Sequence, residues 1–555
     1  MTYRADINGL RSIAVMAVIV HHAGFAPHGG FLGVDIFFVI SGFLITGILL
    51  RDLDEERFSL KTFYNRRIRR ILPALVFVGM CTLPFAWTLM SPEQFAHFGR
   101  TLIALPLFAT NFIFWRESGY FEPDSAEIPL IHTWSLAVEE QFYVFFPLTL
   151  LLIWWLGRRL VLPFLLLGLA GGLILAEYGV RHHPSAAFYL LPFRAWELLA
   201  GAVAAVLAHR LGRTGEVYSG LRPVPAHWNN ALAGAGLTAV TISLIVFLPE
   251  SGSPGYKVAP LVAGTVLILL FTTPGTLVYR LLALRGMVGI GVISYSAYLW
   301  HQPLFAFARI ASFEPPSAAM MLALIVLTLG LAWLSWWLIE EPFRRRLPLR
   351  AVYGSVLAGF AGFIALGLIA HNTEGLTGAR FAQPQVQWFE TVSFSPKRDA
   401  CHDRPERLPP PDQACIYFGD AAPGWAVLGD SHGVELAYAL GRALEPRGET
   451  VVQLTASACA PAYTFESLRK DCSRWTRTSV DWLAAHPDID TVVLAYRHIG
   501  HLYPNLDPTP HGTPKIVEGT SDSEKRALYW QGFSEIVRRL SVAGQRIVIL
   551  EPVPE

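Results

Sequence analysis

Residues 10–24 read Leu-Arg-Ser-Ile-Ala-Val-Met-Ala-Val-Ile-Val-His-His-Ala-Gly, an apolar run with a cation near its start and two imidazoles near its end. Arg11 and His22 are eleven positions apart, which corresponds to roughly 16 Å along a helix axis. Ionisable side chains inside membrane spans are costly and are usually kept for function. We therefore predict a membrane helix that carries a proton-handling group, His22, well inside the bilayer. The alternative is that His22 only hydrogen-bonds and packs against a neighbouring helix.

The composition of the whole chain agrees with a membrane protein. Of its 555 residues, 53% are hydrophobic and only 16% are charged, which is typical of several membrane spans rather than of one large soluble core. The net charge of +1 gives no indication of a nucleic-acid partner. The first apolar run lacks a small-residue cleavage site, so we expect a retained span and not a signal peptide. After about residue 372 the chain is richer in Pro, Asp, Arg and Cys, which indicates a separate soluble domain.

The cysteines support this division of the chain. Cys401, Cys415, Cys459 and Cys472 lie in the soluble part, whereas Cys81 is alone in an apolar segment and is expected to be a small buried side chain. Four cysteines in one short region indicate two disulfides and an oxidising compartment. Pairing of sequence neighbours is the simplest of the three possible connectivities. Zinc is the alternative, but the region has no CxxC pair, so no metal site is expected.

Eleven apolar runs are long enough to cross a membrane. A further run at 100–115 is ambiguous. The eleven runs are residues 12–26, 32–50, 71–90, 141–156, 160–178, 188–208, 229–248, 256–273, 288–310, 317–339 and 350–371.

Basic residues between the runs predict the topology. Under the positive-inside rule the loops that carry them should all be cytoplasmic, which is consistent only if 100–115 does not cross. We therefore expect 100–115 to be re-entrant or interfacial, in protein-buried irregular backbone. About eleven crossings from a cytoplasmic N-terminus place the C-terminal domain outside the cytoplasm, in agreement with the cysteines. The basic residues are Arg51, Arg57, Lys61, Arg66, Arg67, Arg69, Arg70, Arg158, Arg159, Arg210, Arg213, Arg222, Arg280, Arg285, Arg344, Arg345, Arg346 and Arg350.

Further ionisable residues recur at membrane depth or at its edge. The arginines before the third span either set the topology alone or also clamp the phosphates of a carrier such as coenzyme A. The adjacent carboxylates at the start of the fourth run need partners or protons. Arg194 and Glu197, at i, i+3 spacing, are expected to form a structural ion pair. The candidate substrate-binding residues are Arg11, Arg66, Arg67, Arg69, Arg70, Glu139, Glu140, His301 and Glu341.

Five ordered segments, 6–15, 33–43, 132–143, 294–301 and 341–344, resemble motifs of the acyltransferase 3 family of integral-membrane O-acyltransferases, which includes O-antigen acetylases. The resemblance covers about residues 1–345. It implies that an acyl group, usually acetyl from cytoplasmic acetyl-CoA, passes across a bacterial cytoplasmic (inner) membrane to an extracytoplasmic glycan. The family's essential histidine and arginine match His22 and Arg11. The family usually has Tyr-His where this chain has His21-His22.

From about residue 424, strand-like and helix-like stretches alternate. Strands are predicted at 425–428, 450–454, 491–495 and 546–550, and helices at 433–444, 473–485 and 522–543. This order is typical of a doubly wound, mostly parallel α/β sheet, whose functional residues lie at the carboxyl ends of strands. Ser431 follows the first of these strands at a strand-to-helix turn, where backbone N–H groups can hold an oxyanion.

The sequence Gly429-Asp430-Ser431-His432 resembles the first block of SGNH hydrolases, in which the serine is the nucleophile. That family carries its catalytic Asp and His in a later Asp-x-x-His block, which is not found before Glu555, so we expect either a sequence that ends early or an incomplete triad. Asp430, His498 and His501 are weak substitutes for the base, and His432 is expected to have a minor role. Ser457 and the pair Arg497-His498 stand at the corresponding ends of the other strands.

The expected layout is an acyltransferase 3 membrane domain at 1–345, an additional membrane helix and linker at 346–375, a periplasmic linker or extension at 376–423 and a partial SGNH-like domain at 424–555. The leading hypothesis is an O-acyltransferase with His22 and Ser431 as catalytic residues, acetyl-CoA as donor substrate, no permanently bound cofactor and membrane lipid around it. The acceptor is left open among lipopolysaccharide O-antigen, exopolysaccharide, peptidoglycan and a glycolipid. A proton-coupled transporter or lipid-linked glycan flippase with a sugar-binding domain is the alternative, and an esterase on a passive anchor is a third.

Overall fold

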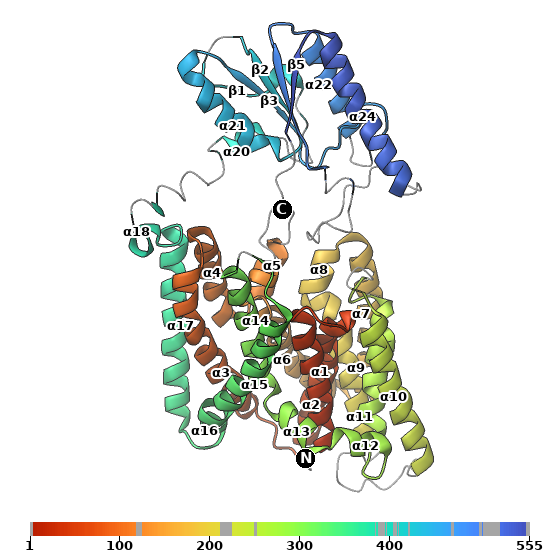
Figure 1. The fold of residues 1–555 in the computed structure, drawn as a ribbon. Helices are drawn as coiled ribbons and strands as arrows, with labels where there is room; N and C mark the ends of the chain where they lie inside the picture. The colour runs from red at the N-terminus through yellow and green to blue at the C-terminus, as the bar shows by residue number, and fades with distance from the viewer. Residues whose placement is uncertain are drawn as a thin grey trace. The chain divides into compact units, whose positions relative to one another are not determined.

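The computed structural model describes residues 4–117, 125–210, 225–248, 252–312, 314–382, 385–386, 395, 397–402, 408, 410–419, 422–467, 471–498, 502 and 522–550. The chain divides into two compact units, Met1–Gln383 and Pro384–Glu555. The first is helical and the second is an α/β unit (Figure 1). Each is described by itself.

Each of the eleven predicted apolar runs coincides mainly with one helix of the first unit, although 188–208 begins in the short helix α8 (Pro184–Tyr189) and 288–310 begins in the short helix that ends at Val292. Eight helical stretches in the described chain have the length and composition to cross a membrane. The remaining three runs form α1, α11 and α14, of which α11 and α14 are short, with 13 and 17 residues. The eleven helices are α1 (Ala5–His22), α2 (Gly33–Asp54), α3 (Leu60–Leu89), α6 (Thr133–Leu156), α7 (Val161–His182), α9 (Leu191–Arg210), α10 (Ala226–Val246), α11 (Ala259–Phe271), α14 (Ser294–Ile310), α15 (Ala318–Ser335) and α17 (Leu349–Asn372).

The ambiguous run at 100–115 is a broken helix. It comprises the end of α4 (Pro92–Ala104), a 3-10 turn at Leu105–Leu107 and α5 (Thr110–Arg116). Phe108 adopts the left-handed conformation with φ of 49°, which ends the turn and redirects the chain. A 13-residue helix such as α4 extends only about 20 Å, so neither piece is long enough to cross. This agrees with the predicted segment that does not span the bilayer.

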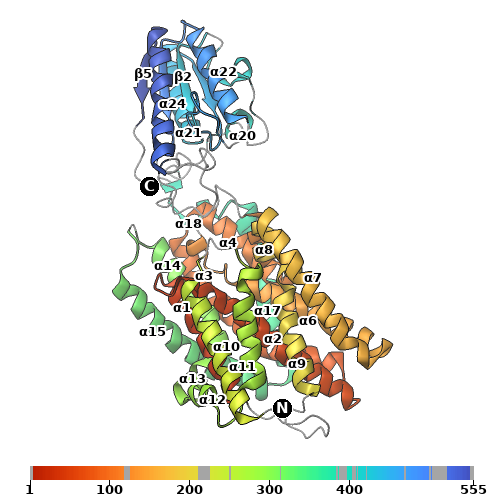
Figure 2. The ribbon, with the colours of Figure 1, turned by 90° about the vertical axis from the view of Figure 1, so that its right-hand side faces the viewer.

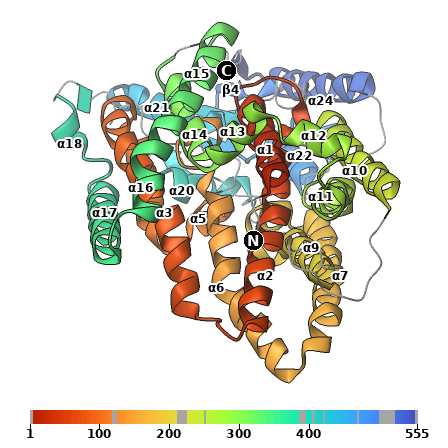
Figure 3. The same ribbon diagram turned by 90° about the horizontal axis from the view of Figure 1, so that it is seen from below.

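Helices α2 and α9 are in direct backbone contact because glycine stands at the two points of closest approach. A Cβ atom on Gly42 would lie 1.8 Å from the carbonyl oxygen of Leu198, and one on Gly201 would lie 2.0 Å from that of Val39. Small residues permit this close packing of membrane helices. α1 in turn packs against α2, α14 and the short helix α13 (Arg285–Val292), as the view along the bundle shows (Figure 3).

The second unit contains a five-stranded sheet in the order β1-β3-β2-β4-β5. Strands β2 to β5 are parallel, and β1 pairs with β3 in the antiparallel sense. The strands are β1 (Ile416–Tyr417), β2 (Trp425–Gly429), β3 (Val451–Thr455), β4 (Thr491–Ala495) and β5 (Arg546–Ile549); the main helices are α21 (Gly433–Leu444), α22 (Cys472–Ala484) and α24 (Asp522–Val542). Figure 2 shows β2 and β5 of this sheet together with helices α21, α22 and α24.

Helices cover both faces of this sheet. Ala426 and Leu428 of β2 pack in the core with α22 and α24, whereas Val427 between them packs in the core with α21. The predicted doubly wound fold is therefore confirmed, and β1 is an addition that the sequence did not indicate. After β2 the chain forms β3 on one side of it and then β4 on the other. The carboxyl end of β2 is thus the switch point where such sheets bind ligands.

The cysteines of the second unit pair as sequence neighbours. Disulfide bonds join Cys401 to Cys415 and Cys459 to Cys472. Cys81 of the first unit is a free, half-buried thiol. Among the described residues, no group of His, Cys, Asp and Glu has the arrangement of a metal site.

Candidate active sites

His22 is the last residue of α1 and contacts α14. Its Nδ1 lies 3.0 Å from Nε2 of His301, and the two rings stack with centroids 5.2 Å apart. Nδ1 of His301 lies 2.6 Å from the carbonyl oxygen of Tyr298, which can only accept a hydrogen bond. In the neutral ring His301 therefore carries its proton on Nδ1, and its Nε2 accepts from Nδ1–H of His22. Nε2 of His22 is then the unprotonated nitrogen, able to take a proton or attack a carbonyl carbon.

A third imidazole completes this cluster. The ring of His132, just before α6, lies 5.4 Å from that of His301 and 5.3 Å from that of Tyr298. His132 is buried. The sequence placed His132 in a motif but not among the site residues, because its approach to α14 depends on the packing of helices far apart in the chain.

A cavity of about 350 Å³, here called the histidine cavity, lies beside His22 and His132. It is lined in part by His21, His22, His132, Arg194, Gln302 and Arg309. Arg309 also donates a hydrogen bond of 2.5 Å to the carbonyl oxygen of His22, which fixes the end of α1 against α14. His21 lies beside Phe31, with ring centroids 5.5 Å apart, so the two adjacent histidines have different surroundings.

A second cavity, of about 90 Å³, contains the arginines and is called the arginine cavity. Glu139 is its acidic member; Tyr143 donates to Oε1 of Glu139 at 2.7 Å, and Ser41 donates to the same oxygen. With three guanidinium groups and one such carboxylate, the lining favours an anionic ligand. Its polar lining includes Arg11, Arg67, Arg70, Ser41, Glu139, Tyr143 and Tyr295.

Val34 and Tyr298 line both cavities, so the two spaces meet at these side chains. The hydroxyl of Tyr298 donates to the carbonyl oxygen of His132 at 3.0 Å and pairs with Oγ of Ser135 at 2.7 Å. These bonds hold the tyrosine in place between them. A group that moved from the arginine cavity to the histidine cavity would pass these two residues.

The structure separates the predicted arginines into two sets. Arg67 and Arg70, three positions apart, share the helix face that lines the arginine cavity. Arg69 instead donates to the carbonyl oxygens of Phe343 at 3.1 Å and Leu347 at 2.8 Å, and Arg66 is exposed, 3.9 Å from Asp52. Helical periodicity alone does not divide the four in this way, because Arg66 and Arg70, four positions apart, lie nearest to each other around the helix.

Two predicted carboxylates also lie outside the described cavity linings. Glu341 forms an i, i+4 ion pair with Arg345 at 2.8 Å. Glu140 follows Glu139 on α6 but does not line the arginine cavity. A residue that the sequence did not select, Glu340, accepts a hydrogen bond from Ser296 of α14.

The expected ion pair of Arg194 and Glu197 is present, and Asp35 joins it. Nη1 of Arg194 lies 3.0 Å from Glu197 and 2.9 Å from Asp35, and all three side chains are at most 1% exposed. The guanidinium also lies 5.2 Å from the ring centroid of Trp134 and 5.0 Å from that of Phe188. One buried cation thus faces two buried carboxyl groups.

We expect Arg194→Leu to destabilise the protein by about 3–5 kcal/mol, because it leaves two buried carboxyl groups without their cation. Thermal unfolding of the detergent-solubilised chain measures the change. The matched control is Arg181→Leu, since Arg181 pairs with Glu177 at 2.7 Å but is 65% exposed and such pairs contribute about 0–1 kcal/mol. Equal destabilisation by both substitutions would contradict this assignment, whereas partial recovery in Arg194→Leu with Glu197→Gln would support it.

Ser431 of the second unit lies directly after β2, at the switch point, and is buried, with 7% exposed. The preceding Asp430 does not act as its partner. The two carboxylate oxygens of Asp430 accept backbone N–H groups, from His432 at 2.9 Å and from Arg497 at 2.7 Å. Asp430 therefore fixes the turn that presents Ser431 and ties it to the end of β4.

The other predicted partners of Ser431 are placed as follows. Nδ1 of His498 lies 2.7 Å from the hydroxyl of Tyr529, and its ring stacks on Trp530 with centroids 5.4 Å apart. The side chain of His432 is exposed. His501 lies outside the described residues. Among the described residues none is in hydrogen-bond contact with Oγ of Ser431, so its base is not assigned.

The helical unit has cavities lined by ionisable side chains, and the doubly wound unit has a serine at its switch point. These features define a membrane protein in which each of the two units contains a candidate active site. Residues 4–337 match the model of the acyltransferase domain, and residues 400–555 match that of the SGNH domain fused to such acyltransferase domains. The chain belongs to the acyltransferase 3 family.

Several named proteins are similar to this chain. The peptidoglycan O-acetyltransferase OatA of Listeria monocytogenes is 32% identical over 358 residues, which cover 62% of this chain and 56% of the relative. The putative peptidoglycan O-acetyltransferase YrhL of Bacillus subtilis is 31% identical over 359 residues, 62% of this chain and 55% of that protein. A putative O-acetyltransferase of Staphylococcus aureus, SAS0844, is 30% identical over 356 residues, 62% and 58% of the two chains.

The chain thus matches a little over half the length of these relatives. No solved structure matches it.

Proposed function

We propose that this protein is an acetyl-CoA-dependent O-acyltransferase that moves an acyl group, in the first instance acetyl, through its membrane unit to hydroxyls of an extracytoplasmic glycan. The observation that carries the proposal is the meeting of the arginine cavity and the histidine cavity at Val34 and Tyr298. One cavity suits a phosphate-bearing donor, and the other contains an unprotonated imidazole nitrogen.

On the donor side, Arg11, Arg67 and Arg70 would bind the phosphates of coenzyme A. Guanidinium groups form charge-assisted and bidentate hydrogen bonds with phosphate oxygens. The thioester end of the donor would then extend toward Tyr298 and His22. Coenzyme A is too highly charged to cross a bilayer, so only the acyl group would proceed.

On the other side of Tyr298, Nε2 of His22 would attack the thioester carbon. The bond from carbon to Nε2 forms, the carbon–sulfur bond breaks and the CoA thiolate leaves, while Nδ1–H of His22 remains hydrogen-bonded to His301. Alternatively, His22 would take the proton of an attacking hydroxyl as a general base. Both roles need the tautomer that His301 and the carbonyl of Tyr298 impose.

The second unit would receive the acyl group on Ser431 and pass it to a glycan hydroxyl. The distribution of basic loops and the two disulfides support an extracytoplasmic, periplasmic or extracellular, location for this unit. The names of the relatives make peptidoglycan the first acceptor to test, ahead of lipopolysaccharide O-antigen and exopolysaccharide.

Purified full-length protein provides the test. With unlabelled acetyl-CoA and radiolabelled free CoA, we expect label to appear in acetyl-CoA. With acetyl-CoA labelled in its acetyl group, we expect transfer of label to a muropeptide or O-polysaccharide when one is added. A transporter or flippase would give no exchange. Failure of exchange would contradict an acyl group carried on the protein, and failure of both exchange and transfer to the glycan, in protein that remains folded and monodisperse, would contradict the proposal.

A further inference from the structure

Ser457 occupies the same edge of the sheet as Ser431. β2 and β3 are parallel neighbours, with Gly429 paired to Thr455. Ser431 and Ser457 each lie two residues beyond this pair, and neighbouring strands are about 4.8 Å apart. Both side chains are buried, with 7% and 6% exposed. The two serines therefore flank the switch point from adjacent strands.

Ser457 is hydrogen-bonded to a histidine from outside the main sheet. Nε2 of His402 lies 2.6 Å from Oγ of Ser457, and Nδ1 of His402 lies 3.1 Å from Oγ1 of Thr455. His402 directly follows Cys401, and Ser457 precedes Cys459 by two residues. Each of the two disulfides thus holds one partner of this hydrogen bond.

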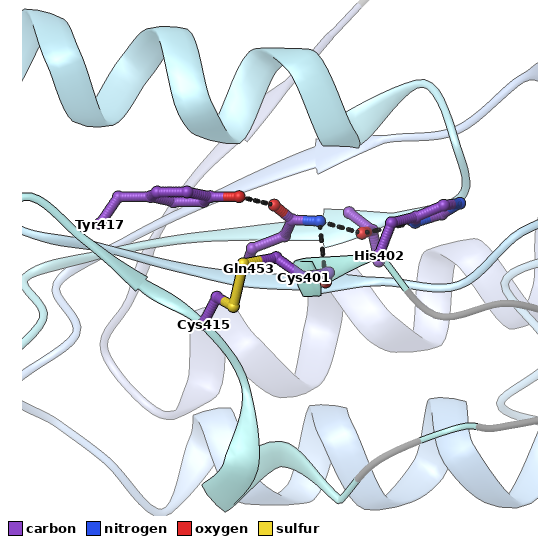
Figure 4. The surroundings of a disulfide bond; sticks show 6 residues. Cys401, His402, Cys415, Tyr417 and Gln453 are labelled. Carbon is purple, nitrogen blue, oxygen red and sulfur yellow. Dashed lines mark hydrogen bonds between the residues drawn. A yellow bond between two sulfur atoms is a disulfide. The ribbon is translucent and has the colours of Figure 1, made fainter. Parts of the chain in front are cut away.

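Figure 4 shows the chain of polar groups that leads to His402. The hydroxyl of Tyr417 donates to Oε1 of Gln453 at 2.5 Å; desolvation, with Glu435 and Tyr438 nearby, raises the pKa of Tyr417 to about 12 and keeps it protonated. Nε2 of Gln453 donates to the carbonyl oxygen of Cys401 at 3.2 Å and to Oγ1 of Thr455 at 2.7 Å.

These hydrogen bonds determine which atom is the donor and which is the acceptor at His402 and Ser457. Oγ1 of Thr455 accepts from Gln453, so its own buried proton needs an acceptor, and Nδ1 of His402 is the acceptor that the described residues offer. A neutral His402 with an accepting Nδ1 carries its proton on Nε2 and donates it to Oγ of Ser457. The hydroxyl proton of Ser457 is then left to be donated to a ligand.

We propose that Ser457 donates a hydrogen bond to the acyl oxygen at Ser431 when that oxygen becomes negatively charged, and that His402 is the positioning residue that orients Ser457. The inference rests on the proposed acyl transfer and extends it, because it assigns a side-chain donor to the second unit. Ser457 makes and breaks no covalent bond. When the Oγ of Ser431 adds to a carbonyl carbon, its hydroxyl proton passes to a solvent water, the π pair moves onto the carbonyl oxygen, and the Ser457 O–H is aimed at that charge.

The test uses the full-length protein in detergent and a fluorophosphonate, which phosphonylates nucleophilic serines through a similarly charged oxygen. Labelling at Ser431, identified by peptide mapping, gives a maximal rate and a half-saturating concentration. We expect Ser457→Ala to lower the maximal rate about 10²- to 10³-fold, the effect of removing one such donor, with the half-saturating concentration little changed. Ser457→Thr, which keeps a hydroxyl, should recover part of the rate.

His402 has its own expected pattern. His402→Leu should slow labelling, and His402→Gln, whose amide N–H can still donate to Ser457, should restore part of it. A purely structural role for His402 would make both variants equally slow. The matched control is Ser479→Ala on α22, which also removes one buried serine hydroxyl but from another part of the unit. This variant should be labelled at the wild-type rate.

The outcomes distinguish this inference from the proposed function. Wild-type labelling in Ser457→Ala, attachment of the label to Ser457 itself, or no labelling of Ser431 in the wild type would each overturn the inference. Exchange of acetyl between acetyl-CoA and CoA and transfer of acetyl to the glycan are measured on the same samples. If both fail but labelling depends on Ser457, the proposed function falls and the Ser431–Ser457 assignment stands.

Discussion

His22→Ala abolishes acetyl exchange, with an expected loss of at least about 10³-fold, because it removes both the attacking nitrogen and the partner of His301. His21→Ala has a much smaller effect, since His21 contacts Phe31 and lies outside the pair of His22 and His301. The measurement is the rate of label exchange between acetyl-CoA and CoA in purified protein, normalised to the monodisperse fraction.

The adjacent histidine is the internal control for this first result. Both substitutions remove one imidazole from the same turn of α1, so a general disturbance of the helix should affect the two variants alike. His301→Ala adds a second comparison: it should lower the rate while leaving some exchange, because His22 keeps Nε2 but loses the acceptor that fixes its tautomer. Full activity in His22→Ala would remove the assignment of this residue.

Ser431→Ala blocks delivery of label to the glycan but leaves the exchange between acetyl-CoA and CoA. The reason is that the two steps use residues of different units, and removal of a serine nucleophile removes only the covalent route that depends on it. Arg11→Ala, which alters the arginine cavity, should reduce both signals. The experiment follows acetyl label from acetyl-CoA onto the protein and onto the added glycan, and in a parallel reaction it follows labelled CoA into acetyl-CoA.

The conservative control for this second result is Ser431→Cys, which retains a nucleophile of similar size. Some transfer to glycan in Ser431→Cys and none in Ser431→Ala would support a covalent step on this side chain. Wild-type glycan labelling in Ser431→Ala would instead mean that the second unit only binds or orients the acceptor. Loss of exchange in Ser431→Ala would show that the two steps are not separable as proposed.

The elements of the fold could be predicted because their signals are local. Each of the eleven apolar runs coincides mainly with one helix, and the βα alternation after residue 424 indicated the strands that place Ser431 at a switch point. β1 was missed because a two-residue strand has no periodicity, and its pairing with β3, next to the disulfide of Cys401 and Cys415, joins segments far apart in the chain.

The composition of the site was less predictable because it depends on contacts between distant segments. Asp35 and Arg194 are 159 positions apart, and nothing in either segment indicates the other. His132 belongs to a recognisable motif, but only the packing of segments far apart in the chain brings it to Tyr298 and His301 of α14. No local sequence pattern pointed to His402. Its role depends on which atom donates in each of four successive hydrogen bonds between distant residues.

The backbone contact of α2 and α9 has a consequence for how an acyl group could travel. Gly42 contacts Leu198 and Gly201 contacts Val39, so the two helices pack too closely to slide along each other. The ion pair of Asp35 and Arg194 joins them further. The two helices therefore form a rigid pair, and Val34 of α2 has a fixed position on it. Passage between the cavities must then be opened by the opposite wall, through a rotation of Tyr298 that exchanges its hydrogen bonds to His132 and Ser135 for water or substrate.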